Sequence, residues 1–125
     1  MKKTDLSKQR KSMSDYKQIL DRAARLCSTG EKCQHDVREK IITWGLEEED
    51  AEKAIRYLVE NNFLDDQRYA RYFVRDKLKF NKWGRVKLSY ALRQKKVAAE
   101  IIEASISEID PELYIEILDN LIASK

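Results

Sequence analysis

The sequence predicts an all-α protein made of tandem three-helix repeats. Only three of its 125 residues are Gly and one is Pro, so it has few of the residues that end helices or form turns. Hydrophobic residues make up 42% of the chain, which is enough for a modest core. From Ser14 onward, apolar side chains recur at helix spacing almost without a break. We therefore expect about seven helices, stacked into an elongated and curved molecule.

Apolar periodicity places each helix in turn. Residues 1–12 are polar and basic and lack such a period, so we expect a flexible basic arm there. Gly30 and Gly45 follow the first two helices, and acids from Glu47 to Asp50 open the third, where the positive helix end favours carboxylates. The expected helices span 14–28, 32–44, 47–61, 65–80, 84–95, 98–108 and 111–123.

Two helix starts carry the same capping signature. Asp65 can accept hydrogen bonds from the free amides of the first turn of the fourth helix. The sequence repeats this arrangement at Asp110, with Pro111 at the first helical position. We therefore interpret Asp65 and Asp66 as residues of a helix cap rather than as metal-binding or catalytic carboxylates.

The helices repeat with a period of about 50 residues. A shift of 51 residues places six apolar positions of the first half on six of the second: Val37 on Leu88, Ile41 on Leu92, Leu46 on Val97, Ala51 on Ile102, Ile55 on Ile106 and Leu58 on Ile109. A shift of 50 places Ile19, Leu20 and Ala23 on Tyr69, Ala70 and Phe73. We predict a first repeat at 13–62, a second at 63–109, and the first helix of an incomplete third repeat at 110–125.

Charge is segregated along the chain. Residues 1–30 carry a net charge of +5, and residues 31–66 carry −6. Residues 67–96 hold eleven Lys or Arg against the single acid Asp76, whereas residues 97–125 carry −6. One carboxylate cannot offset eleven neighbouring cations, so internal pairing and solvation explain the basic block less well than a partner surface does.

The basic block predicts a binding face. At about 100° per residue, Arg68, Arg75 and Lys79 share one direction on the fourth helix, and Arg71 lies roughly 60° away. We expect the cations to line one exposed face, where they suit an acidic protein groove or phosphates. The candidate partner-binding or DNA-binding residues are Arg68, Arg71, Arg75, Lys79, Lys82, Trp83, Arg85, Lys87, Arg93, Lys95 and Lys96.

The aromatic residues of this region have a functional and a structural interpretation. Trp83, beside Gly84, could stack on a base or fill a partner pocket, or it could cover the helix junction. Trp44 lies on an apolar face and is predicted to be core. Tyr69 and Tyr72 lie on either side of the apolar face of the fourth helix, and we predict that both pack.

Several function classes lack support in the sequence. Cys27, Cys33 and His35 have no fourth ligand and the wrong spacing for a zinc site, and the two Cys are interpreted as reduced thiols. No phosphate loop, nucleophile elbow or general-base constellation is present, so we expect neither an enzyme nor a cofactor. The N-terminus lacks a hydrophobic signal segment and no apolar run reaches the ~18 residues of a membrane span, which predicts a cytoplasmic protein without membrane contact.

Two stretches carry a family resemblance. The segment AARLCSTGEKCQHDVREKIITWG, residues 23–45, precedes AIRYLVENNFLDDQRYARYFVRDKLKFNKWGRVKLSYALRQKKV, residues 54–97. The most specific part is LVENNFLDDQRYA, residues 58–70, followed by a basic stretch, a Gly and the helix end from Leu92 to Val97. In these features the chain resembles the RecX family, bacterial regulators of the RecA recombinase, over about residues 14–123.

The resemblance implies a function in regulation. RecX proteins have tandem three-helix repeats, usually three, and no enzymatic activity or cofactor. They bind in the groove of the RecA filament on DNA and restrain strand exchange and coprotease activity. The first hypothesis is therefore a regulator that binds this filament, in which direct contact with single- or double-stranded DNA through phosphates is open. A DNA-binding helical protein without sequence specificity, acting independently of RecA, and a helical scaffold are the alternatives. We expect a monomer.

Overall fold

The computed structural model describes residues 13–109, 111–112 and 115–116, and within these ranges the regular structure is helical throughout. The six helices are α2 Met13–Ser28, α3 Gln34–Thr43, α4 Glu48–Glu60, α5 Asp66–Asn81, α6 Arg85–Gln94 and α7 Ala99–Ser107. Each of them begins and ends within two residues of its predicted bounds. The all-α fold is thereby confirmed. The arm predicted at 1–12 and most of the helix predicted at 111–123 lie outside the described residues.

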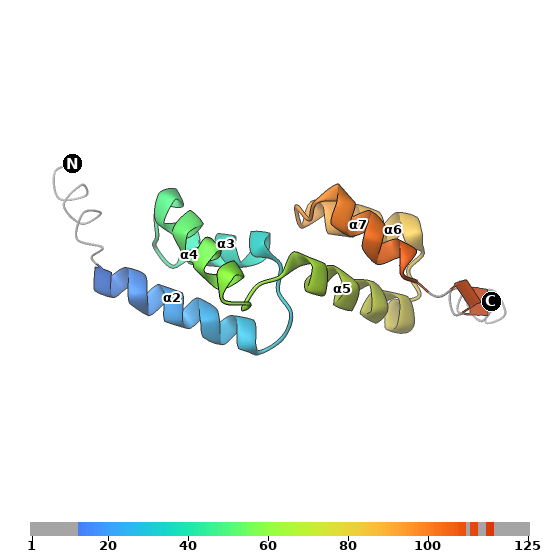
Figure 1. The fold of residues 1–125 in the computed structure, drawn as a ribbon, viewed down its shortest axis with the longest axis horizontal. Coiled ribbons are helices and arrows are strands. Elements are labelled where there is room, and N and C mark those ends of the chain that lie inside the picture. Colours follow the sequence, from blue (N-terminus) through green and yellow to red (C-terminus); the bar gives the residue numbers. More distant parts are fainter. Residues whose placement is uncertain (1–12, 110, 113–114, 117–125) are drawn as a thin grey trace. The chain divides into compact units, whose positions relative to one another are not determined.

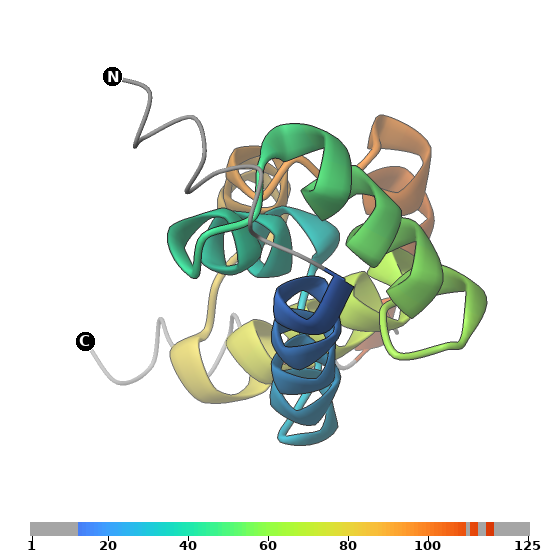
Figure 2. The same ribbon diagram turned by 90° about the vertical axis from the view of Figure 1, so that its left-hand side faces the viewer.

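The chain divides into two units, Met1–Leu64 and Asp65–Lys125. In the first unit α3 and α4 lie on the same side of α2, as both ribbon views show (Figures 1 and 2). Their apolar faces meet in a core that includes the fully buried Ala23, Val37, Ile41 and Leu58. Burial of these faces is the main favourable contribution to the stability of such short helices.

Trp44, predicted to be a core residue, packs against the core but is only partly buried. Its ring packs against the core of the first unit, while the guanidinium of Arg22 lies over the ring, 4.0 Å from its centroid. The ring thus packs on the core and also binds a cation from α2.

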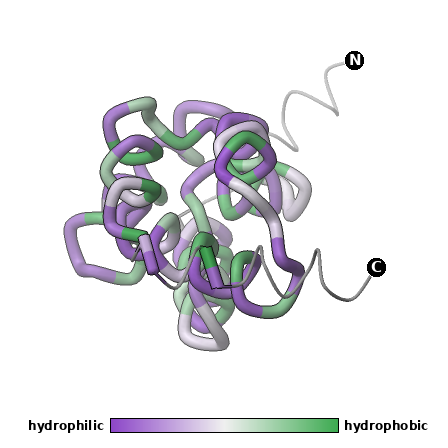
Figure 3. The backbone as a smooth tube through the Cα atoms, turned by 90° about the vertical axis from the view of Figure 1, so that its right-hand side faces the viewer, coloured by the Kyte–Doolittle hydropathy of each residue, from purple (hydrophilic) through white to green (hydrophobic). Residues whose placement is uncertain are grey.

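In the second unit α6 and α7 pack on α5 (Figure 1). The backbone coloured by hydropathy shows polar and apolar residues alternating along the helices, as amphipathic helices require (Figure 3). The core consists of one face from each helix, with these buried side chains: Tyr69, Ala70, Val74, Leu78, Leu88, Leu92, Val97 and Ile102.

The main-chain hydrogen bonds of the two units confirm the internal repeat. The N–H of Leu46 donates to the carbonyl of Ile41 over 3.3 Å, and 51 residues later the N–H of Val97 donates to the carbonyl of Leu92 over 3.2 Å. The same shift relates three further pairs of bonds: Val37 to Cys33 and Leu88 to Gly84, Gly45 to Ile42 and Lys96 to Arg93, and Ala51 to Glu47 and Ile102 to Ala98. All the apolar residues paired by this shift are buried except Ile106, which is half-buried.

The C-terminal ends of α5 and α6 are built without glycine. Lys82 and Lys96, which follow α5 and α6, have φ values of 58° and 60°. The position equivalent to Lys96 in the first unit is Gly45, with a φ of 120°. The second unit therefore holds a side chain in a backbone conformation that glycine adopts more readily.

The expected cap of α5 is present. The carboxylate of Asp65 accepts hydrogen bonds from the main-chain N–H groups of Gln67, over 2.9 Å, and of Arg68, over 3.2 Å. These bonds satisfy two of the amides that the first turn leaves free. The prediction of a capping residue at Asp65 is therefore confirmed.

Candidate partner-binding surface

The predicted binding cations of α5 lie on one side of the helix. Ala70, Val74 and Leu78 bury the opposite face against the rest of the second unit. The other face presents a row of side chains at helical spacing, which we call the α5 stripe: Arg68, which is half-buried, and the exposed Arg71, Tyr72, Arg75 and Lys79. Amphipathic spacing thus places the basic side chains where the core cannot use them.

Tyr72 corrects one prediction. Its side chain is 53% exposed, whereas Tyr69, which was assigned the same packing role, is 8% exposed. The ring of Tyr69 lies 5.8 Å from that of Phe73, measured between centroids. Tyr72 instead lies between Arg71 and Arg75 on the stripe, so the site contains an exposed aromatic residue that the sequence analysis assigned to packing.

The carboxylates near the stripe engage only part of it. Arg71 pairs with Glu108, at the end of α7, with 3.5 Å between Nε and Oε2, and both side chains are about half exposed. Asp76 lies 4.0 Å from the ammonium of its neighbour Lys77. Within the described residues, Arg75 and Lys79 form no ion pair. These two cations can therefore meet an external anion without first breaking an internal pair.

Trp83 is a packing residue of the α5–α6 junction. Its ring lies edge-on to that of Phe73, with 6.1 Å between centroids. The ammonium groups of Lys77 and Lys87 lie 5.4 and 4.6 Å from the Trp83 ring centroid. These contacts support the junction interpretation of Trp83, and a role in partner binding stays a prediction.

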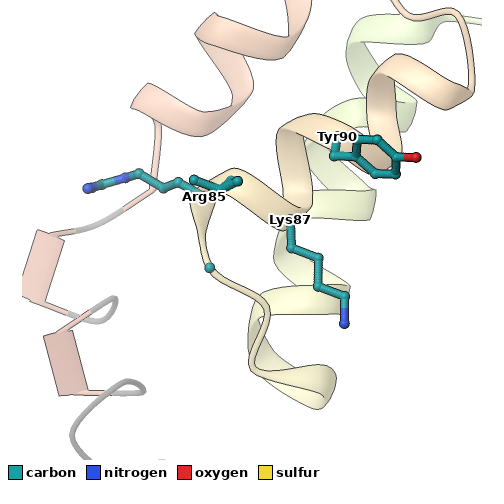
Figure 4. A pocket seen from close by; sticks show the side chains of 5 residues that line it. Arg85, Lys87 and Tyr90 are labelled. Carbon is teal, nitrogen blue, oxygen red and sulfur yellow. The ribbon is translucent and has the colours of Figure 1, made fainter.

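The cations of α6 surround the helix instead of sharing one face. Arg85 and Lys87 extend to opposite sides of its first turn (Figure 4). Between them stand Val86, 85% exposed, and Tyr90, 61% exposed. Gly84 and these four residues line a shallow, open pocket. The cations predicted on α5 thus share one side of that helix, whereas those of α6 do not, and the sequence analysis missed Val86 and Tyr90 of α6.

The remaining predicted cations lie at helix ends. Lys82 ends α5, and its ammonium donates to the carbonyl of Lys79 over 3.3 Å. Arg93 is exposed in the last turn of α6, and Lys95 and Lys96 follow it. The predicted residues thus gather in two places, the α5 stripe and the first turns of α6 around Arg85 and Lys87, which we call the α6 surface.

Other kinds of site find little support in the described part of the chain. No group of three or more His, Cys, Asp or Glu side chains there is placed to hold a metal ion. Searched over the same residues, none of the helices has the length and apolar content of a membrane span.

Comparison with known proteins identifies the family. Residues 65–106, which contain the α5 stripe and α6, match the second three-helix domain of RecX. The regulatory protein RecX of Clostridium botulinum (strain Eklund 17B / Type B) is 46% identical over 81 residues, and that of Lactobacillus johnsonii is 34% identical over 112 residues. The chain belongs to the RecX family. Its relatives are named regulatory proteins.

The matches cover a larger share of this chain than of its relatives. The matches cover 65% and 90% of this chain but 37% and 41% of the Clostridium and Lactobacillus RecX proteins. The RecX of Prosthecochloris aestuarii is 35% identical over 99 residues, which are 79% of this chain and 66% of that protein. A crystal structure of a regulatory protein RecX matches 87% of this chain and 54% of its own, with a TM-score of 0.80 at 22% identity, which shows a shared fold.

Proposed function

We propose that this RecX-family chain binds the RecA recombinase filament on DNA and restrains its recombinase and coprotease activities. The observation that carries the proposal is the α5 stripe, whose cations Arg71, Arg75 and Lys79 are exposed inside the domain that matches RecX. Family membership supplies the partner, and the stripe supplies a surface that can meet it.

The geometry of the stripe suits a polyanionic partner. At 1.5 Å of rise per residue, the eleven steps from Arg68 to Lys79 span about 16 Å. A row of that length can contact several carboxylates or phosphates at once, and each such contact is weak alone. Binding that requires many contacts favours a partner that repeats its charges, as a filament does, over an isolated subunit.

Tyr72 supports a second candidate function. An exposed aromatic ring among arginines is a typical platform for the bases of single-stranded nucleic acid, and such binding tolerates any sequence. The chain would then bind DNA independently of the recombinase. Base-specific reading is disfavoured, because the most exposed side chains in the first turns of α6 include Val86 and Tyr90, which do not form the paired hydrogen bonds that read base edges.

One titration separates these functions. Anisotropy of the fluorescently labelled chain is measured against bare single-stranded DNA, bare duplex DNA, free recombinase and the recombinase filament, at several salt concentrations. Binding that is much tighter to the filament than to any component supports the proposal. Equally tight binding to bare DNA favours the second candidate, and no binding to any of the four leaves a scaffold without a role on DNA.

A charge reversal tests the stripe itself. We expect Arg75→Glu with Lys79→Glu to weaken filament binding by at least about tenfold, because two attractions become repulsions. Arg71 is left intact, because reversing it would also break its pair with Glu108. The matched control is Arg25→Glu, the exposed residue of α2 that lies 50 residues before Arg75. Equal affinity of the double variant and the wild type, with unchanged thermal unfolding, would remove α5 from the interface.

A further inference from the structure

The first turns of α6 expose an apolar ridge. Val86 is 85% exposed and Tyr90 61%, and they stand one helical turn apart on the side of α6 opposite the buried Leu88 and Leu92. Exposed apolar side chains that stand together on a surface are a common feature of protein-binding sites, because covering them removes apolar area from water.

The first unit shows that the fold does not need this ridge. The repeat places His35 and Glu39 of α3 at the positions of Val86 and Tyr90. Both are polar, and α3 packs on its unit in the same hydrogen-bonding register. The same helix packs in the first unit with polar residues at these two positions, so the apolar pair of α6 is not required for folding.

Positive charge surrounds the ridge. Arg85 and Lys87 extend to opposite sides of the helix at the level of Val86 (Figure 4), and the exposed Arg93 lies three residues beyond Tyr90. The first turn of α6 contains no acid, and its cap is Gly84, so the positive end of the helix dipole adds to the field. At the position of Lys87, the first unit has Asp36, a charge of the opposite sign.

We propose that Val86 and Tyr90, with Arg85, Lys87 and Arg93, form a docking site for an acidic protein segment that carries a bulky apolar side chain. The apolar side chain covers Val86 and Tyr90, and carboxylates on either side of it pair with the flanking cations. A nucleic acid fits less well, because the aliphatic side chain of Val86 offers nothing to a phosphate. The inference rests on the proposed function only in taking the segment to belong to the regulated filament.

The test uses the full chain and synthetic peptides. The probe is a short fluorescein-labelled peptide of Glu and Asp with a central Phe-Leu pair, and its comparison peptide has Ser in place of Phe and Leu. We expect the first peptide to bind at least about tenfold more tightly than the second. Val86→Ser with Tyr90→Ser should abolish that difference, whereas His35→Ser with Glu39→Gln, at the matching positions of α3, should leave it unchanged.

A second variant keeps the ridge and removes its charge. Arg85→Gln with Lys87→Gln should weaken binding of the acidic peptide by at least about fivefold, because the flanking cations hold the carboxylates. Thermal unfolding of each variant is measured alongside, because Lys87 also lies over the ring of Trp83, and binding is compared at a temperature where every variant is folded. Equal binding of the Phe-Leu and Ser peptides to the wild type overturns the proposal.

Other occupants give distinct results. The proposal is overturned, and the site is assigned to nucleic acid, if oligothymidylate displaces the Phe-Leu peptide and the Val86→Ser, Tyr90→Ser variant binds that peptide as tightly as the wild type does. A dimer in sedimentation that the Val86 and Tyr90 variant abolishes also overturns the proposal. If the chain binds the peptide but not the recombinase filament, the docking site stands and the proposed function falls. If it binds the filament but not the peptide, the docking site falls and the proposed function stands.

Discussion

Asp65 is a single residue whose contribution to stability can be isolated. Its carboxylate accepts two main-chain hydrogen bonds from the first turn of α5. We predict that Asp65→Ala lowers the free energy of unfolding of the second unit by about 1 kcal/mol, the usual loss when a helix cap is removed. Asp65→Asn should retain most of that stability, because an amide oxygen caps almost as well.

Urea denaturation of the Trp44→Phe protein provides the measurement. The sequence has two tryptophans, so this background leaves Trp83 of the second unit as the fluorescent reporter. Equal losses for the Ala and Asn variants would show that the charge of Asp65, rather than its hydrogen bonds, stabilises α5.

Tyr16 gives a pH dependence to the first unit. Burial raises the pKa of its phenol above the ordinary 10.0, and the nearby Asp50 and Tyr57 raise it further. The unfolded chain therefore loses this proton at lower pH than the folded chain does. The contribution of Tyr16 is fully present below pH 10 and is lost as pH rises through the higher folded pKa.

We predict that Tyr16→Phe reduces this alkaline loss of stability. The free energy of unfolding, measured by urea denaturation at pH 8 and at values above 10, should fall less steeply with pH in the variant. The control is Tyr72→Phe on α5, whose ring is exposed. If the free energy of unfolding falls equally with pH in the two variants, titration elsewhere in the chain accounts for the effect.

Individual residues were predictable where the cause was local. The cap at Asp65 depends on a side chain and amides two and three residues away, so the sequence contains all of it. The exposure of Tyr72 depends on how far α6 and α7 cover α5, which helical spacing alone does not state. Tyr69 and Tyr72 therefore received the same prediction and differ in the structure.

At the scale of one element, the two repeats differ in the residue that follows the C-terminal end of α3 and of α6. Lys96 and Gly45 occupy equivalent positions with positive φ. We predict that Lys96→Gly stabilises the protein by up to about 1 kcal/mol, because it relieves the strain of a side chain there. Gly45→Lys should destabilise by about 1 kcal/mol or more, since a φ of 120° suits glycine alone. Thermal unfolding measures both, and a stabilised Gly45→Lys protein would contradict the prediction.

The helices themselves were predictable to within two residues, because apolar period and capping residues act within one element. The α6 surface was not. Cations were assigned to the site by their charge, whereas Val86 and Tyr90 were passed over as helical apolar residues. The signal was available in the repeat, which aligns them with the polar His35 and Glu39 of α3.

For the molecule as a whole, the two repeated units share a fold and differ in the charge of their sequences. The two units share the order of three helices and four equivalent main-chain hydrogen bonds, so the fold is common to both. Their surfaces differ: residues 31–66 are acidic, and residues 67–96 carry a net charge of +10. The surface residues of the second unit can therefore differ from those of the first while its core keeps the shared apolar pattern.

This division predicts how filament binding responds to salt. A cation that neutralises a phosphate releases counterions, so the logarithm of the binding constant falls linearly with the logarithm of salt concentration. We predict that Arg75→Gln with Lys79→Gln makes this slope shallower by about 1 to 2, because each lost contact removes close to one unit. Arg25→Gln, at the matching position of the first unit, should leave the slope unchanged. The measurement is filament binding by anisotropy over a range of KCl concentrations. A slope that is the same in all three proteins would mean that the cations of α5 meet no charge on the partner, and the binding surface would then have to be sought on α6.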